Sequence, residues 1–350
     1  MVNDWPFASI IVPVYNGGRT IDALLNSLLA LDYPADRREI LVVDNKSTDD
    51  TCERVQRYPV TLLEETEIQG SDAARNRGIE AARGEILAFT DADCVVEPTW
   101  LKRLLANHEE PRWGGFSGST RAYPSSSLIA RYCAHAKVLD LSRQHEVFFQ
   151  PDGMGERLCN RISLLDYHAD ISLPAGLINP HTANVAYRRI VFEKIGYFDQ
   201  KMLPTGGDFD LAWRLQTQTD WQIAIVPDAV VYHQHRENLG GFTSMYRSYG
   251  GGYAILALKY SSAPERTAQQ LMAAGLIIVA LTTPAHLLKV LMLPVKAIGR
   301  RPDASFWSEP ILELIASVYY NYGKAEVARR WLSSRDCEAQ LGYNLHATGR

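Results

Sequence analysis

Strand-like and helix-like segments alternate over the first ninety residues, and this alternation constrains the fold more than any other feature. Short apolar runs typical of buried strands occupy residues 9–14, 39–44, 60–65 and 85–91. Helix-like segments lie between them, at residues 20–31, 47–58 and 71–84. Repeated strand–helix units predict an α/β fold, with a mainly parallel central sheet and helices on both of its faces.

Polar side chains follow three of these strands at the point where each strand ends. The first strand leads into Tyr15-Asn16, the second into Asp44-Asn45, and the fourth into Asp91-Ala92-Asp93. Ligands of open α/β sheets bind beyond the carboxyl ends of the strands. The sequence therefore predicts a binding site along this rim, although any one of these ends could be an ordinary polar turn.

Asp91 and Asp93 are two carboxylates separated by one alanine. Such hard oxygen ligands bind Mg²⁺ or Mn²⁺, usually together with substrate phosphates. Arg75 and Arg77 precede them on the helix-like segment, and the arginine fork fits a phosphate. The alternatives are an exposed turn for the two carboxylates and a solvated helix face for the arginines.

A second acidic pair and a histidine pair lie further along the chain. Asp208 and Asp210 follow Gly206-Gly207 and open a helix-like segment at residues 209–218. One acid could cap that helix while the other faces a cleft as a base. Strands are expected within residues 221–233, and His233 and His235 after them share one face, where an imidazole could contact a metal or phosphate.

Charge and cysteine content narrow the class of protein. The formal net charge is −4 and the sequence pI is about 6.2, which gives no support for bulk binding to nucleic acid. Five cysteines, none at zinc-finger spacing, indicate reduced thiols in a cytoplasmic protein. The start of the chain carries no basic segment and is interpreted as a first strand rather than a signal peptide.

We expect two units along the chain. Residues 1–238 would form the α/β domain, with a nucleotide-binding half at about 1–110 and an acceptor-facing half at about 111–238. Residues 239–350 would form a helical region rich in tyrosine and glycine. Within it, residues 271–301 are mostly apolar, and the interpretations are contact with the cytoplasmic face of the inner membrane, a buried helical hairpin, or a homodimer surface.

Five segments resemble the family 2 glycosyltransferases, which have the Rossmann-like GT-A fold and invert the anomeric centre. They are ASIIVPVYNGGRTIDALLNSLLALDYP, EILVVDNKSTDDT, GSDAARNRGIEAARGEILAFTDADC, TANVAYRRIVFEKIGYFD and GGDFDLAWRLQ, and they span about residues 7–236. The resemblance implies a hexosyltransferase-type enzyme that needs Mg²⁺ or Mn²⁺. Its donor would be a nucleotide sugar, most simply a UDP-sugar, and its acceptor a cell-envelope glycan or lipid-linked molecule.

The resemblance also implies roles for individual residues, with Asp208 as the catalytic base and Asp93 and His233 as metal ligands. The nucleotide sugar would bind to Pro13, Val14, Tyr15, Asn16, Asp44, Asn45, Ser47, Arg75, Asn76, Asp91, Ala92 and Asp93. The donor sugar and acceptor would contact Thr182, Asn184, Asp210, Trp213 and Arg214.

Two positions depart from the family's pattern. Gly207 stands where many members have a glutamate before the base, and Asn45 stands where many have a second aspartate. Two other functions remain open. A non-catalytic nucleotide-sugar-binding module would bind a donor without releasing nucleoside diphosphate, and a nucleotidyltransferase of similar topology would release pyrophosphate.

Overall fold

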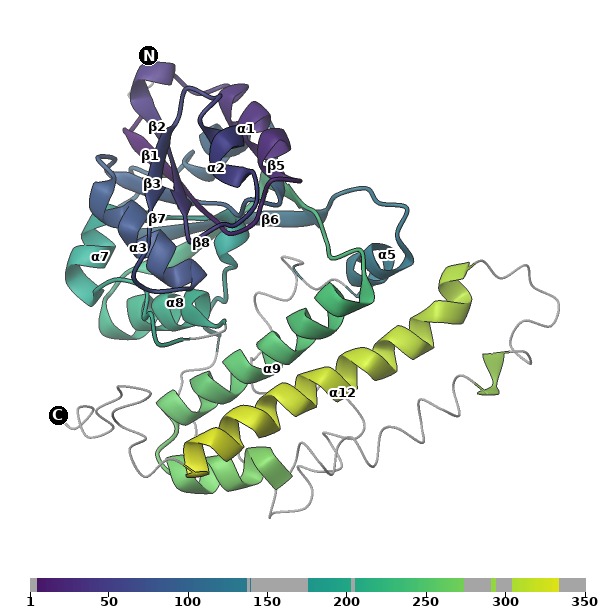
Figure 1. The fold of residues 1–350 in the computed structure, drawn as a ribbon. Coiled ribbons are helices and arrows are strands. Elements are labelled where there is room, and N and C mark those ends of the chain that lie inside the picture. The colour runs from purple at the N-terminus through teal and green to yellow at the C-terminus, as the bar shows by residue number, and fades with distance from the viewer. Residues whose placement is uncertain are drawn as a thin grey trace.

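The computed structural model describes residues 5–136, 139, 176–202, 205–273, 291–293 and 304–333. In these ranges the strands form one mixed sheet in the order β3-β2-β1-β4-β7-β6-β8-β5. Two long helices, α9 (Leu239–Tyr260) and α12 (Ala304–Ser333), run side by side outside the α/β unit (Figure 1). The predicted α/β class and the helical C-terminal region are confirmed.

The first half of the sheet is parallel. It contains β1 (Ala8–Val14), β2 (Arg38–Asp44), β3 (Thr61–Glu64) and β4 (Ile86–Phe89). The connections carry α1 (Ile21–Leu29), η1 (Ala35–Arg37), α2 (Thr51–Val55) and α3 (Ser71–Ala81). Because β2 lies on one side of β1 and β4 on the other, the chain leaves a crevice at the carboxyl ends of β1 and β4.

The second half of the sheet is mixed. It contains β5 (Cys94–Val96), β6 (Trp113–Ala122), β7 (Val185–Arg188) and β8 (Gln222–His233). The helices here are α4 (Trp100–Leu104), α5 (Leu128–His135), η4 (Thr182–Asn184), α7 (Arg189–Ile195) and α8 (Gly207–Gln218). β7 pairs antiparallel with β4 and β6, whereas β6 and β8 are parallel.

β8 is one strand where the sequence suggests more than one. Pro227 lacks the N–H that a continuous ladder needs. The pairing of β6 with β8 shifts between Gly118 and Ser119, so that residues 227–229 fall outside the regular register. Ser119 Oγ donates a hydrogen bond to the carbonyl oxygen of Pro227, which stabilises this irregularity.

The apolar core lies on both faces of the sheet. Val12 packs on one face in a cluster that includes Leu24 of α1 and Trp100 of α4. Ile11, the preceding residue of β1, points to the other face in a cluster that includes Ile79 of α3 and Leu211 of α8. Alternate residues of one strand therefore serve two cores, which confirms that helices cover both faces.

Glycines bring α9 and α12 into close backbone contact. A Cβ on Gly250 of α9 would collide with the carbonyl oxygen of Tyr320, and one on Gly323 of α12 would collide with that of Arg247. Only glycine permits this approach of two helix backbones. The presence of glycine at position 250 of α9 and position 323 of α12 is therefore explained by the packing of the two helices.

The interpretations of residues 271–301 lie largely outside the described residues, which include only 271–273 and 291–293 of that segment. No helix in the described ranges combines the length and apolar character that crossing a membrane requires. Membrane contact, a hairpin or a dimer surface stays a prediction, as does the division of the chain after residue 238.

Candidate functional site

A cavity of about 1080 Å³ opens at the carboxyl ends of β1, β2 and β4 and extends to α9 and α12. Many of the predicted site residues line it: Pro13, Val14, Tyr15, Asn16, Asn45, Arg75, Asp91, Ala92, Asp93, Thr182, Asp208 and His233. The volume exceeds that of a typical pocket for one drug-sized ligand, roughly 300–1,000 Å³. Asp93 and Asp208 therefore line one large cavity, although they are far apart in the sequence.

Asp91, Asp93 and His233 form a group that could hold a metal ion. Each offers one ligand atom, and these atoms lie within 4.8 Å of one another. The pairing of β5 with β8 explains the arrangement, because Cys94 is directly opposite His233. Two carboxylates and an imidazole are suitable ligands for Mn²⁺ or Mg²⁺. The donor set of these residues therefore fits a divalent cation.

Other groups surround these three residues. His233 Nε2 lies 3.3 Å from Asp93 Oδ1, and an Arg236 guanidinium nitrogen lies 3.8 Å from Asp93 Oδ2. The His235 ring is 5.2 Å from the His233 ring and also lines the cavity. Burial, followed by the charges of His233 and Arg236, lowers the pKa of His235 to about 4, so its ring is neutral at neutral pH.

Arg75 links two carboxylates on the cavity wall. It is 6% exposed, and its two terminal nitrogens each lie 2.9 Å from a carboxylate oxygen, one from Asp72 and one from Asp91. Its Nε is buried and has no hydrogen-bond partner among the described residues. Arg75 therefore holds Asp91 in place at the cavity wall. The sequence analysis did not identify Asp72.

Asp208 lies at the start of α8 and faces the cavity. The chain reaches it through Gly206, whose φ of +108° is rarely adopted by other residues. Asp208 Oδ1 accepts a hydrogen bond of 3.0 Å from the Phe209 N–H, and His181 Nδ1 is 3.9 Å from Oδ2. Burial is the main cause that raises the pKa of Asp208 to about 6. This carboxyl can therefore accept a proton near neutral pH.

Gly207 leaves room for the carboxylate of Asp72. A Cβ at position 207 would collide with Asp72 Oδ2. Asp72 is 5% exposed, and burial is the main cause that raises its pKa to about 6. The carboxylate of Asp72, from α3, thus occupies the space that a side chain at position 207 would take. Asp72 and Asp208 line the same cavity.

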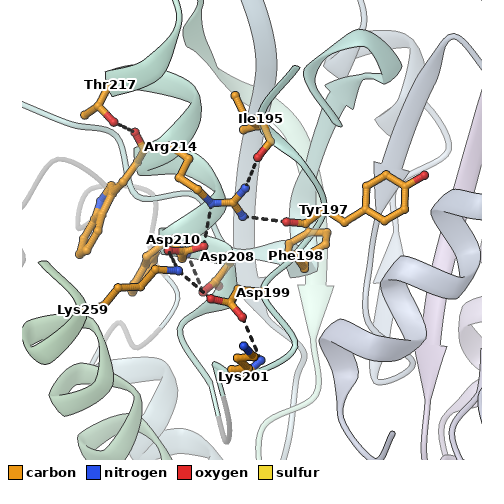
Figure 2. A network of polar contacts seen from close by, with 12 residues as sticks. Ile195, Tyr197, Phe198, Asp199, Lys201, Asp208, Asp210, Arg214, Thr217 and Lys259 are labelled. Atoms are coloured by element: carbon orange, nitrogen blue, oxygen red, sulfur yellow. Dashed lines mark hydrogen bonds and ion pairs between the residues drawn. The ribbon is translucent and has the colours of Figure 1, made fainter. Parts of the chain in front are cut away.

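The second acid of the pair, Asp210, connects α8 to α9 through buried polar contacts. It is fully buried and accepts from Arg214 Nε at 2.9 Å, Tyr260 Oη at 2.8 Å and Lys259 Nζ at 2.6 Å. Figure 2 shows Lys259 between Asp210 and Asp199, so that α9 is tied to α8. Asp210 forms no helix cap and does not line the cavity. Its contact with a sugar stays a prediction.

Arg214 and Trp213 also make contacts within the protein. Arg214 donates to the carbonyl oxygens of Ile195 and Tyr197 (Figure 2). Trp213 is 1% exposed and donates to Asn179 Oδ1 at 2.7 Å. Neither residue is part of the cavity lining. The resemblance implies that Trp213 and Arg214 lie beside the sugar and acceptor. In the structure their side chains lie outside the cavity lining and contact other parts of the protein.

Two buried asparagines that were predicted to contact substrate bridge distant segments instead. Asn76 exchanges two hydrogen bonds with the backbone of Phe198, at 2.8 and 3.0 Å. Asn184 accepts from Trp100 Nε1 and donates to the carbonyl oxygens of Ser119 and Ala229, all at 2.8 Å. These contacts occupy their amide groups and position the neighbouring Thr182 and Arg75.

The predicted nucleoside residues after β1 and β2 form a connected rim. Asn16 accepts from the Thr48 N–H at 2.7 Å and donates its own N–H to Ser47 Oγ at 2.8 Å. Asn45 Oδ1 accepts from the Gly70 N–H at 2.6 Å. Asp44 accepts from the Ser47 N–H, and its other oxygen, Oδ1, is buried and finds no hydrogen-bond partner in the described part of the chain. Asp44 and Ser47 do not line the cavity.

The sequence analysis missed the side of the cavity formed by the C-terminal helices. Tyr249 and Tyr253 of α9 and Tyr320 of α12 line it. Arg236, which follows β8, also lines it. A long helix rich in tyrosine and glycine indicates close packing against other elements, but the sequence does not say which face of α9 meets the cavity. The only available signal was the spacing of the lining residues, which recur on one face of the helix.

The family model described as Glycosyl transferase family 2 matches residues 9–196, more than half of the chain. The chain belongs to this family. In Haloferax volcanii, the glycosyltransferase AglE is 44% identical to it over 108 residues, which are 29% of this chain and 36% of AglE. The pre-mycofactocin glycosyltransferase of Mycobacterium tuberculosis is 26% identical over 273 residues, which are 76% of this chain and 50% of that protein.

The family 2 chain described here thus spans half or less of the length of these two curated relatives. A solved structure with a similar fold is the mannosyltransferase PcManGT from Pyrobaculum calidifontis in complex with GDP-Man and Mn²⁺. Its TM-score is 0.56 at 20% identity, and the match covers 91% of this chain and 88% of that one. This likeness confirms the fold of the family 2 chain.

Proposed function

We propose that the chain is a metal-dependent inverting glycosyltransferase. It would move a sugar from a nucleoside diphosphate sugar, with UDP as the expected nucleotide, to a hydroxyl group of a glycan or lipid-linked acceptor. The observation that carries this proposal is that acidic residues from two separate segments of the chain line one cavity. Asp91 and Asp93 lie beside His233, and Asp208 lies on the α8 side.

Asp208 is the proposed base. Its carboxylate takes the proton of the acceptor hydroxyl while that oxygen bonds to the anomeric carbon. The bond between the anomeric carbon and the diphosphate oxygen breaks, and its electron pair leaves with the nucleoside diphosphate. Attack from the face opposite the leaving group inverts the centre. A positioned base contributes about 10²- to 10⁴-fold in rate.

Asp91, Asp93 and His233 would hold the cation, Mg²⁺ or Mn²⁺. When bound there, a divalent ion would offset the charge that develops on the departing diphosphate. Arg75 would support the same end of the cavity, because one of its terminal nitrogens keeps Asp91 oriented.

The test is a donor screen with UDP- and GDP-sugars, with and without EDTA, in which released nucleoside diphosphate is measured. Release that needs the metal and an acceptor supports the proposal. A parallel reaction with nucleoside triphosphates and sugar 1-phosphates tests the nucleotidyltransferase alternative, which would release pyrophosphate. Nucleotide binding without any release would indicate a binding module. Either outcome would refute the proposed transfer.

Asp208→Asn should lower transfer at least 10²-fold and leave nucleotide affinity within about twofold, because an amide cannot accept the proton. Calorimetry with nucleoside diphosphate and Mn²⁺ checks the affinity, and the donor assay checks the rate. Asp228→Asn is a matched control, because Asp228 is exposed on β8 and does not line the cavity. Transfer at the normal rate by Asp208→Asn would refute its role.

The acceptor and the location follow from the same proposal. A cell-envelope glycan or a lipid-linked acceptor would be assembled at the cytoplasmic face of the membrane, and residues 271–301 would provide a peripheral contact. Cell fractionation of the full chain beside a variant with Leu291→Ser and Met292→Ser tests this, since both side chains are exposed. An unchanged distribution between membrane and supernatant would refute the contact.

A further inference from the structure

One face of α9 lines the cavity along four turns of the helix. The lining positions are 241, 244, 245, 248, 249, 252, 253 and 256, which recur at the spacing of a single helix face. Tyr320 of α12 extends this surface. The proposed catalytic groups leave it unused, and it lies on the α8 side of the cavity, where Leu256 approaches Gly206.

The two helices are closely packed behind this surface. Gly250 fits against the backbone of Tyr320, and a Cβ on Gly252 would lie 2.5 Å from the carbonyl oxygen of Thr205. The rings of Tyr253 and Tyr320 are 6.1 Å apart, and Lys324 Nζ lies 5.2 and 4.9 Å from their centroids. Lys324 is 1% exposed and does not line the cavity, so its charge supports the rings from behind.

The chemistry of this surface differs from that of the donor end. Elsewhere the cavity is lined by Asp72, Asp91, Asp93 and Asp208, and by Arg236 beside Gly241, whereas the lining residues of α9 and α12 themselves carry no formal charge. Aromatic rings, serine hydroxyls and a thioether provide flat apolar area with hydrogen-bonding groups at its border. An anion that entered here would lose water without touching a charged side chain of either helix, because Lys324 lies behind the rings and does not line the cavity.

We propose that Tyr249, Tyr253 and Tyr320, with Ser244 and Ser248, form an acceptor subsite for an uncharged sugar ring. The rings of Tyr249 and Tyr320 would pack against the C–H face of the sugar, with the largely buried Tyr253 supporting them, and the hydroxyl groups would bond to its hydroxyls. The acceptor hydroxyl would then reach Asp208 from the α9 side. This inference rests on the proposed function, and it specifies the class of acceptor as a neutral glycan.

Saturation-transfer NMR on the full chain tests the subsite without need for turnover. The probes are methyl β-glucoside, methyl β-glucuronide, which differs only in its carboxylate, and 1-hexanol, which has a hydroxyl but no ring. We expect the strongest transfer to the glucoside. Tyr249→Ala should reduce it at least fivefold, whereas Tyr249→Phe should retain most of it.

Tyr319→Ala is the matched control, since Tyr319 is exposed on α12 outside the cavity. Ser244→Trp is a second variant, in which an exposed position is enlarged so that the subsite is filled without loss of a packed ring. It should abolish transfer to the glucoside and leave nucleotide binding unchanged. Circular dichroism verifies that each variant is folded.

Equal transfer to the glucoside in wild type and both Tyr249→Ala and Ser244→Trp would overturn the subsite. So would a stronger signal for the glucuronide or hexanol, or no transfer to the glucoside in wild type. The donor screen is read separately. Glucoside binding that depends on Tyr249 without release of nucleoside diphosphate would refute the proposed function and leave the subsite standing, and the converse result would refute the subsite alone.

Discussion

The ionisation of Asp208 sets the pH range in which it can act as a base. Its pKa is raised to about 6, so it is protonated over a range in which an ordinary aspartate is already ionised. A base acts only when unprotonated. We therefore expect kcat/KM to rise as the pH increases through about 6 and to level off above it, in a series at fixed metal concentration. A rise centred near 4 would contradict this.

Gly207 is the residue whose size matters most at the site. Gly207→Ala places a methyl group against Asp72 Oδ2, so Asp72 must move and its contact with Arg75 must change. We expect a loss of about 1–3 kcal/mol in the free energy of unfolding and at least tenfold weaker transfer.

Gly240→Ala is the control for this change, because a Cβ there lies 3.6 Å from its nearest neighbour, an ordinary contact. Thermal unfolding and the donor assay measure both variants. If Gly207→Ala and Gly240→Ala had the same stability and the same transfer rate, the close fit of Asp72 against Gly207 would contribute nothing to either property.

At the scale of elements, the pairing of β5 with β8 brings together residues that could hold a metal ion. This pairing places His233 beside Asp93, although the two residues are far apart in sequence. We expect His233→Ala to weaken binding of Mn²⁺ with nucleoside diphosphate at least tenfold, because one of the three proposed ligands is lost. His135→Ala, at an exposed position on α5, should leave the affinity unchanged. Calorimetry that shows equal affinities would remove His233 from the site.

The elements also show why the sequence predicts some features well. The strands β1, β2 and β4 are buried on both faces, so their unbroken apolar runs identify them, and polar residues at their ends indicate the rim. β8 was predicted less well because Pro227 breaks the pattern locally, while its pairing with β6 resumes afterwards. Local pattern cannot reveal a register shift, which depends on the partner strand.

Side-chain roles were harder to predict than elements, because a motif does not specify where an amide or carboxylate finds its partners. Asn184 and Asp210 occur in segments that resemble the family, yet their polar atoms bond to distant backbone and side-chain groups. Asp72 escaped notice because its importance depends on a glycine in another helix. Contacts of this kind become visible only in the folded molecule.

At the scale of the whole molecule, the raised pKa of Asp208 has a cost for stability. Since the native state binds more protons than the unfolded state between about pH 4 and 6, the free energy of unfolding falls as the pH rises through that window. Asp208→Asn removes this effect. We expect the variant to be more stable than wild type at pH 7.5, by at most about 3 kcal/mol, and similar at pH 4.

Chemical denaturation at both pH values measures this difference. Asp228→Asn is again the control, because an exposed aspartate should change little at either pH. Equal stability of wild type and Asp208→Asn at pH 7.5 would mean that the folded protein does not penalise the ionised carboxylate.

The glycine contacts between α9 and α12 have a consequence for chimaeric proteins. Each helix carries a glycine that accommodates a carbonyl oxygen of the other, so a replacement of either helix must keep a glycine at that position. Lys259 of α9 extends this dependence to Asp210 of α8. A graft that moves the helix pair into another protein must therefore also provide a carboxylate at the position of Asp210.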